Sequence, residues 1–339
     1  MFLRDIRESV QLSAAICSIL TNSFLFLLIA YKSPNEIGNY KYMLQSVSLF
    51  EMLYGVLDIV ASPITFTVGS IFMVIIPHND KYFGRQGAMF LNTIYCFFFG
   101  FSMGMFVVIF AYRLMVSRGD RILLHFKGLK IISLFIFPLF YGFVWGLISL
   151  FPFAPTPEKD DFIRDEIREK LNLTLDEIAY TAPLYYSKTR RKVIISSVLS
   201  ISVQWMLVAL SLFLVGWFGL KCYSYIRRLL ETQETRSPKL QELQNQLFLA
   251  LVLQASIPIF LMHIPVIILY TFSLLSWEFD PITVCITISL FPALDPFPTI
   301  FVIRGYREAC FEMLQQGLRW MCCLKPRTSF ELRTVSIVL

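Results

Sequence analysis

Long runs of uncharged, apolar residues constrain the fold of this chain more than any other feature. Five such runs, each longer than the ~20 residues that a helix needs to cross a bilayer, lie at 9–31, 86–112, 131–157, 193–220 and 243–277. Two more apolar segments, at about 42–63 and 281–303, have a similar length but contain acidic residues. The mean hydropathy of +0.63 and the charged share of only 16% are typical of a membrane protein rather than a soluble one.

The sequence therefore predicts an all-α membrane protein with a bundle of seven transmembrane helices. We expect the spans at about 10–31, 42–63, 86–112, 131–151, 193–220, 245–275 and 281–303. Residues 64–77 are apolar and rich in β-branched side chains but short, so we expect a strand-like or partly embedded outer loop, with an eighth span as the alternative. An amphipathic surface helix at 304–323 and a cytoplasmic tail at 324–339 complete a single domain of residues 1–339.

The distribution of basic residues favours a topology with the N-terminus outside. In this orientation, 18 of the 30 lysine and arginine residues fall in the segments expected on the inner side. The long outer connection before the fifth span contains no cysteine. A disulfide cannot order this connection, so its order must come from packing.

Two kinds of modification site follow from this topology. Asn172 begins an Asn-Leu-Thr sequon in the long outer connection and is predicted to carry an N-glycan. Cys322 and Cys323 end the amphipathic helix at the inner membrane surface, where they are candidate palmitoylation sites.

Three acidic residues lie within the predicted spans, where a charge is costly and usually faces the bundle interior. Glu51 and Asp58 are almost two turns apart on the second helix, so they share a face. At about 1.5 Å per residue, Glu51 and Asp295 each lie ~14 Å from the inner surface. Two interpretations stay open: the two carboxyls share a proton, a cation or a water cluster, or each bonds to a kinked backbone separately.

Prolines are expected to form hinges in the sixth and seventh helices. Pro258 and Pro265 flank His263, and Pro296 directly follows Asp295 in the seventh helix. Such a bend frees backbone groups and can be biased by a ligand. His263 is predicted either to bind a ligand or, as lone intramembrane histidines more often do, to satisfy a neighbouring group.

The basic inner rim favours anionic lipid or a cytoplasmic partner over nucleic acid. Arg113 ends the third helix, where it either extends to the headgroups or points inward as a switch. Arg118, Arg227 and Arg228 are predicted to border the same cleft on the partner-facing side. No enzyme, metal-binding or cofactor motif is present in the sequence, so we expect neither catalysis nor a cofactor.

Several strings in the sequence resemble those of a known receptor family. They are "SPNEIGNYKYML", "LFEMLYGVLD", "FAYR", "IAYTAPLYY", "LQNQLFLALVLQASIPIFLMHIP" and "FPALDPFPTIFVIRGYR". In this order, from Ser33 to Arg307, they resemble the Str group of nematode serpentine chemoreceptors, which are odorant-receptor-like G-protein-coupled receptors.

The resemblance implies a receptor in the plasma membrane, typically in the cilia of chemosensory neurons. It would bind a small odorant-like chemical from outside and activate a heterotrimeric G protein. Arg113 would take the place of the arginine that ends the third helix in rhodopsin-like receptors, although Tyr112 stands where those carry an acidic residue. Asp295-Pro296 would be the hinge in the position of their Asn-Pro.

Two other classes of protein remain as alternatives. One is a seven-span ligand-gated ion channel of the insect odorant-receptor type, which has the opposite orientation. The other is a transporter that uses the three intramembrane acids as a proton path. A transporter would be expected to contain inverted repeats, and the sequence shows none.

Overall fold

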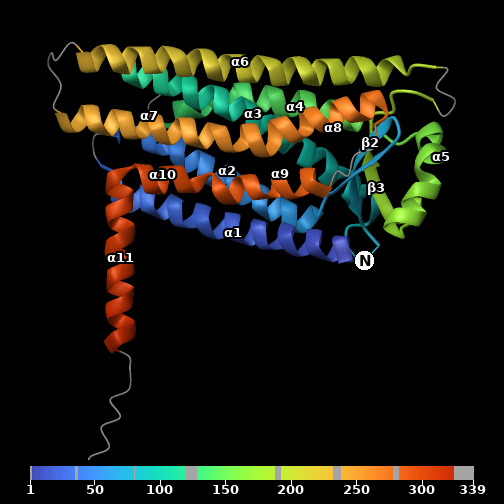
Figure 1. Ribbon diagram of the computed structural model, residues 1–339, viewed down its shortest axis with the longest axis horizontal. Coiled ribbons are helices and arrows are strands. Elements are labelled where there is room, and N and C mark those ends of the chain that lie inside the picture. Colours follow the sequence, from blue (N-terminus) through green and yellow to red (C-terminus); the bar gives the residue numbers. More distant parts are fainter. Residues whose placement is uncertain are drawn as a thin grey trace, which may run out of the picture.

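The chain forms a bundle of long helices with a small sheet at one end and a projecting helix at the other (Figure 1). The computed structural model describes residues 2–34, 37–79, 81–119, 128–187, 192–231, 238–277 and 282–323. Seven helical segments among these residues are long and apolar enough to cross a membrane. The predicted seven-helix membrane bundle is therefore confirmed.

The bundle helices are, in chain order, α1 (Phe2–Lys32), α2 (Tyr40–Ala61), α3 (Gly84–Arg118), α4 (Ile136–Leu150), α6 (Ile195–Glu231), α7 (Pro238–Pro258), α8 (Ile264–Leu275), α9 (Ile282–Leu294) and α10 (Pro296–Val302). The 3₁₀ helix η3 (Gly128–Phe135) leads into α4 in the fourth span. A π-helical turn, η6 (Ile259–His263), joins α7 to α8 in the sixth span, and α9 with α10 forms the seventh. Both composite spans are interrupted at prolines, which cannot donate the helical hydrogen bond.

A three-stranded antiparallel sheet lies at one end of the bundle, and it includes the segment at 64–77 for which a strand-like loop was expected. The segment at 64–77 folds into a hairpin of β1 (Ile64–Val68) and β2 (Ile71–Pro77), not into a span. β3 (Ile178–Thr181), from the connection before α6, pairs with β2. The sheet thus joins two loops that are far apart in the sequence.

A short helix covers the sheet on the side away from the bundle (Figure 1). This helix, α5 (Pro157–Glu166), continues into the π-helical turn η4 (Ile167–Leu171). Ile163 and Ile167 are fully buried and belong to a small hydrophobic core with residues of all three strands. We refer to the sheet, α5 and η4 together as the cap, and to this end of the bundle as the cap end.

Asn92 of α3 ties the cap to the bundle. Its side chain is fully buried, and its Nδ2 donates to the carbonyl oxygen of Val74 in β2 at 2.8 Å. Its Oδ1 accepts from Thr181 Oγ1 of β3 at 3.3 Å. The cysteines whose side chains are described all have free thiols: Cys17, Cys96, Cys222, Cys285 and Cys310. Hydrogen bonds and packing therefore hold the cap in place.

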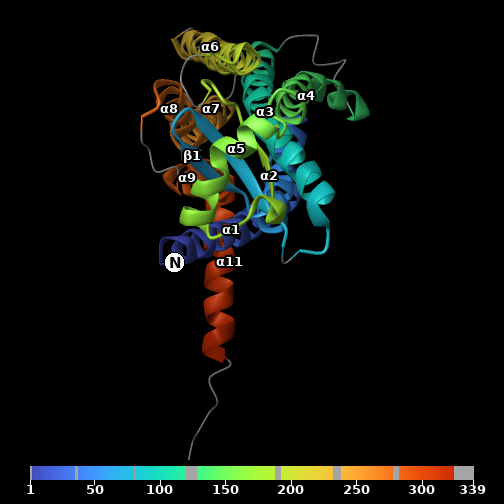
Figure 2. The same cartoon turned by 90° about the vertical axis from the view of Figure 1, so that its right-hand side faces the viewer.

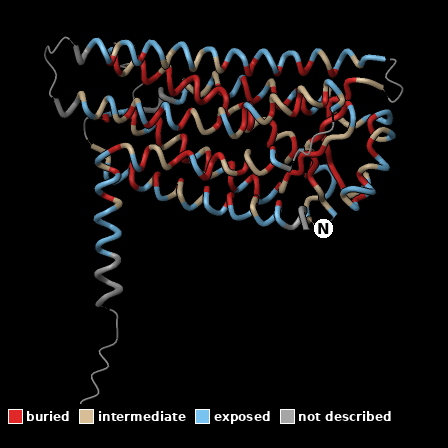
Figure 3. The backbone as a smooth tube through the Cα atoms, in the orientation of Figure 1, coloured by how far each residue is buried: buried red, intermediate tan, exposed pale blue. Residues whose placement is uncertain are grey.

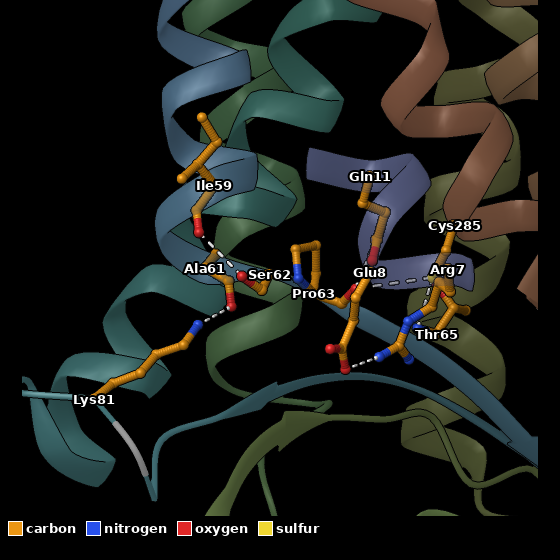
Figure 4. Close-up of polar contacts among 10 residues, drawn as sticks. All are labelled: Arg7, Glu8, Gln11, Ile59, Ala61, Ser62, Pro63, Thr65, Lys81 and Cys285. Carbon is orange, nitrogen blue, oxygen red and sulfur yellow. Dashed lines mark hydrogen bonds and ion pairs between the residues drawn. The ribbon is translucent and has the colours of Figure 1, made fainter. Parts of the chain in front are cut away.

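Polar contacts also fix β1 to the helices around it (Figure 4). Gln11 Nε2 of α1 donates to the carbonyl of Pro63 at 3.0 Å. Thr65 of β1 donates its backbone N–H to Cys285 Sγ of α9, at a distance of 2.9 Å. Lys81 Nζ donates to the carbonyl of Ala61 at 2.8 Å, which satisfies an orphan acceptor at the end of α2. The cap end of the bundle is thus joined by residues from α1, α2, α9 and β1.

At the other end, α11 (Arg304–Cys323) turns steeply away from the bundle axis (Figure 1), as a helix lying on a membrane surface would. Tyr306 at its start is fully buried, and its hydroxyl lies 2.7 Å from Ser33 Oγ at the end of α1. The side chains of Cys322 and Cys323 and the whole segment 324–339 lie outside the described residues.

Candidate functional site

Glu51 of α2 and Asp295, between α9 and α10, have neighbouring carboxyl groups in the bundle interior. Each residue is only 1% exposed. Two neighbouring buried carboxylates cannot both stay ionised without a large electrostatic cost. If the pair keeps one proton, the protonated carboxyl can donate a hydrogen bond to the ionised one. The arrangement is suited to holding a single negative charge over two groups.

Two further residues complete this polar cluster. Gln254 of α7 donates its Nε2 to Asp295 Oδ2 at 2.8 Å. Asn22 of α1 lies against Glu51 and donates its Nδ2 to the carbonyl of Pro292 at 2.8 Å. The latter bond has a cause in the sequence, because Pro296 has no N–H to give to the Pro292 carbonyl four residues before it. The acid pair therefore connects α1, α2, α7 and the proline break of the seventh span.

Asp58 does not belong to this cluster. It lies beside Ser289 of α9, near the hydroxyls of Tyr54 and Tyr95, on the cap side of Glu51. Asp58 Oδ1, Ser289 Oγ and Tyr54 Oη are all buried in this second group. The three intramembrane acids thus form two separate sites at different depths.

His263 is 4% exposed and ends the π-helical turn η6. Its Nδ1 lies 3.0 Å from the carbonyl oxygen of Pro258, so it satisfies a neighbouring backbone group. Pro265 occupies the first turn of α8, where the missing N–H is tolerated. The two prolines therefore bracket a widened turn, a feature that is frequent at functional sites.

His263 also lines a small cavity of about 10 Å³ between α3, α6 and α7. This volume holds about one water molecule. The other lining residues are Met103, Phe106, Ser211, Leu212, Val215, Ala255, Pro258 and Ile259. The wall is thus mostly apolar, with a few polar groups, as is usual for a small-molecule site.

Arg113 points into the bundle rather than toward headgroups, and it is fully buried. Its Nη2 donates to the carbonyl oxygen of Gln244 in α7 at 2.8 Å, and its guanidinium lies 5.5 Å from the ring centre of Tyr40. Nε and Nη1 have no hydrogen-bond partner in the described part of the chain. Since an unpaired buried donor is costly, this side chain is ready to bind an acceptor.

The other predicted rim residues lie at the surface. Arg118, Arg227 and Arg228 are exposed at the α11 end of the bundle, so they do not share the buried position of Arg113. The structure therefore separates one buried arginine from three that solvent or a partner can reach directly.

Asn172 is exposed on the cap and has a left-handed backbone with φ of 54° directly after η4. Two residues on, Thr174 forms a capping box in which its backbone N–H donates to Glu177 Oε2 at 2.7 Å. This bond and that of the Thr174 hydroxyl hold the pKa of Glu177 below its ordinary value. The sequon thus lies in an ordered, accessible turn.

Sequence reasoning missed Asn22, Gln254 and Asn92, which hold the acid pair and the cap. All three are amides inside otherwise apolar runs, and each is buried in the structure. A buried amide needs a partner, so its presence in a span was the available signal.

Comparisons with known proteins agree with this architecture. The family model described as serpentine type 7TM GPCR chemoreceptor Str matches residues 7–311. G-protein coupled receptor str-217 of Caenorhabditis elegans is 50% identical over 336 residues, which cover 97% of this chain and 98% of that protein. G-protein coupled receptor str-33 of the same organism is 25% identical over 318 residues, covering 92% of this chain and 91% of that protein.

A more distant relative is serpentine receptor class r-10 of Caenorhabditis briggsae. It is 24% identical over 338 residues, covering 97% of this chain and 93% of that protein. The seven spanning segments, the match along most of the chain and these relatives lead to one assignment: the chain belongs to the Str family of serpentine seven-transmembrane chemoreceptors.

Proposed function

We propose that the protein binds a small, odorant-like molecule within its helical bundle and activates a heterotrimeric G protein on its inner side. The cap end would face outward and the α11 end would face the cytoplasm, in the plasma membrane and in the cilia of chemosensory neurons. Membership of the Str family supports the class of function. The observation that carries the signalling step is the buried contact between Arg113 and Gln244.

This contact holds α7 against α3 at the α11 end of the bundle, the end proposed to face the cytoplasm. A signalling partner would find a closed rim as long as Arg113 Nη2 is bonded to the Gln244 carbonyl. When α7 moves away, all three guanidinium nitrogens of Arg113 become available for acceptors on the partner, with the exposed Arg118, Arg227 and Arg228 around them. Binding a new acceptor replaces the lost bond, so the partner would stabilise the open state.

The proline breaks provide the means by which a ligand could open the rim. The π-helical turn η6 forms part of the cavity wall, and the same helix continues through α7 to Gln244, which bonds Arg113. Gln254, on the same helix, bonds to Asp295 at the break of the seventh span. A ligand that prefers a different shape of η6 would change both contacts together, and the shift equals its differential affinity for the two states.

Nucleotide exchange on purified G-protein heterotrimers, with the receptor in lipid nanodiscs, tests this proposal. We expect Arg113→Ala to lower the receptor-dependent exchange rate at least about tenfold, since a charged contact is worth ~1.5–3 kcal/mol. Arg118→Ala, the matched exposed control, should change the rate by less than about threefold.

The alternative channel function makes a different prediction. Current through planar bilayers that contain the receptor alone, without any exchange on a panel of heterotrimers, would contradict the proposal. Equal effects of Arg113→Ala and Arg118→Ala would contradict the specific role of the buried arginine.

A further inference from the structure

The cap closes the bundle to a molecule that approaches from water at the cap end. Figure 2 shows the sheet and α5 lying across this end of the helices. Phe72 of β2 is 5% exposed and stacks on Tyr270 of α8, with 4.7 Å between ring centres. Tyr185, which follows β3, is fully buried. A route from the aqueous side would require the cap to leave, which would expose its hydrophobic contacts.

The other route to be considered runs from the bilayer through the boundary between α6 and the α7–α8 helices, which we call the seam. Near the cap end, Tyr270 Oη donates to Gln204 Oε1 at 3.1 Å and so joins α8 to α6. Toward the other end, Tyr223 of α6 and Phe248 of α7 have ring centres 6.1 Å apart. The cavity at His263 lies between these two contacts along both helices.

The lipid side of this cavity is only partly covered. Leu212 and Val215 of α6 and Ile259 of η6 line it, and each is of intermediate exposure rather than buried. Neighbouring side chains such as Phe213 and Phe260 are exposed at 62% and 66% and face the membrane. The hydrocarbon phase is therefore the nearest surroundings of the cavity.

The polar groups of the cavity define the chemistry of its occupant. A carbonyl oxygen only accepts, so Nδ1 of His263 carries the hydrogen in its bond to Pro258, and Nε2 of the neutral ring is an acceptor. Ser211 Oγ uses its hydrogen in a 2.9 Å bond to the carbonyl of Val208, which leaves acceptor lone pairs. Both side chains offer acceptors, and the matching ligand group is a donor.

We infer that a largely apolar molecule with one hydrogen-bond donor, of the alcohol or phenol class, enters from the bilayer between α6 and α7 and donates to His263 Nε2. This inference rests on the proposed receptor function and specifies its ligand class and route. The cavity of about 10 Å³ is too small for such a molecule. Entry must therefore move α6 and η6 apart, which links binding to the helix that Arg113 holds.

Photolabelling of the receptor in nanodiscs with a diazirine derivative of 1-octanol tests the site. We expect adducts on 255–263 of α7 and η6 and on 103–106 of α3, mapped by mass spectrometry. The methyl ether of the same probe, which cannot donate a hydrogen bond, should label at least about fivefold less.

Two variants separate the ligand contact from the structural one. His263→Asn keeps an amide donor in reach of the Pro258 carbonyl but removes the acceptor at Nε2, and should reduce labelling by about fivefold or more. Phe260→Leu, one turn away on the lipid face, should leave labelling unchanged and serves as the control. Leu212→Trp, on the open side of the cavity, should slow labelling.

Labelling that is unaffected by His263→Asn, or equal for the alcohol and its ether, would overturn the inference. Nucleotide exchange measured on the same preparations keeps the two proposals apart. Labelling at the seam without exchange on any heterotrimer would contradict the signalling function alone. Exchange stimulated by 1-octanol without labelling at the seam would contradict the proposed site alone.

Discussion

At the scale of single residues, the proximity of Glu51 and Asp295 makes each carboxyl depend on the other. Removing either charge leaves the remaining carboxyl free to take the proton or the charge by itself. We expect Glu51→Gln and Asp295→Asn each to change basal nucleotide exchange, and the double variant to add little to the larger single effect.

A double-mutant cycle on the exchange rate measures this coupling. Asp58→Asn is the matched control, because Asp58 lies seven residues along α2, or ~10 Å, from Glu51. Its effect should add to that of Asp295→Asn within about 0.5 kcal/mol. Strict additivity between Glu51 and Asp295 would contradict a shared site.

Asn92 is the second residue whose substitution should affect a larger part of the structure, because it joins α3 to the cap. Asn92→Ala leaves the Val74 carbonyl and the Thr181 hydroxyl without their buried partner. Each such group costs ~1–3 kcal/mol, so thermal unfolding of the receptor in detergent should occur at a clearly lower temperature. Thr93→Ala, which removes only a bond to the Met89 carbonyl of its own helix, should have a small effect. Equal effects of the two variants would rule out Asn92 as a tie.

At the scale of helices, the contact of α3 with α4 requires glycine at its centre. A Cβ on Gly104 would lie 2.6 Å from the Cα of Pro138, a backbone atom that cannot move aside alone. Gly104→Ala should therefore destabilise the fold by ~1–3 kcal/mol, as measured by thermal unfolding. Gly216 of α6 has no atom within 4 Å of the same position. Gly216→Ala should instead stabilise by up to ~1 kcal/mol, and destabilisation by both would contradict the packing argument.

Lys159 of α5 gives the cap a dependence on pH. Burial lowers the pKa of this lysine from 10.5 to about 8, and Asp160 acts in the opposite direction. Since the folded-state pKa is below the unfolded one, the charged ammonium costs stability below pH 8. That cost disappears as the pH rises from about 8 to 10.5, so the cap should become more stable across this window.

Amide hydrogen exchange of the cap, corrected for the intrinsic pH dependence of exchange, measures this effect. Lys159 Nζ donates to the carbonyls of Pro152 and Ala154. Lys159→Met removes these hydrogen bonds together with the titrating amino group. In that variant the rise in protection between pH 8 and 10 should be absent. A rise of the same size in Lys159→Met would assign it to another group.

For the whole molecule, the orientation in the membrane determines which end meets the ligand and which meets the partner. With the cap outside, Asn172 would be glycosylated, because it lies in an exposed, ordered turn. Treatment with an N-glycosidase should then increase the electrophoretic mobility of receptor from animal cells. Asn172→Gln should show the faster mobility without treatment, and no shift in either would argue against this topology.

The whole architecture and the site were predictable to different degrees. Seven apolar segments are long enough to cross a bilayer as helices, and a helix satisfies all of its backbone hydrogen-bonding groups in lipid. The seven spans could therefore be predicted. The sheet was only partly predictable, since residues 64–77 had the composition of strands but β3 pairs with them from more than a hundred residues away. Local patterns contain no information on such a pairing.

The same limit applies to the polar cluster. Counting residues along the helices placed Glu51 and Asp295 at one depth, and in the structure they are neighbours. The partners Asn22 and Gln254 depend on which face of α1 and α7 points inward, and the packing of all the helices decides that. Their assignment therefore required the three-dimensional arrangement of the helices.

The tie between Asn92 and the cap has a practical consequence for the chemistry of the receptor. Because the cysteines whose side chains are described have free thiols and hydrogen bonds hold β2 and β3 to α3, formation of the cap needs no oxidation step. Folding of the cap should therefore not depend on a disulfide isomerase. Reductants such as dithiothreitol should leave its unfolding temperature unchanged, so they can be present throughout expression and purification.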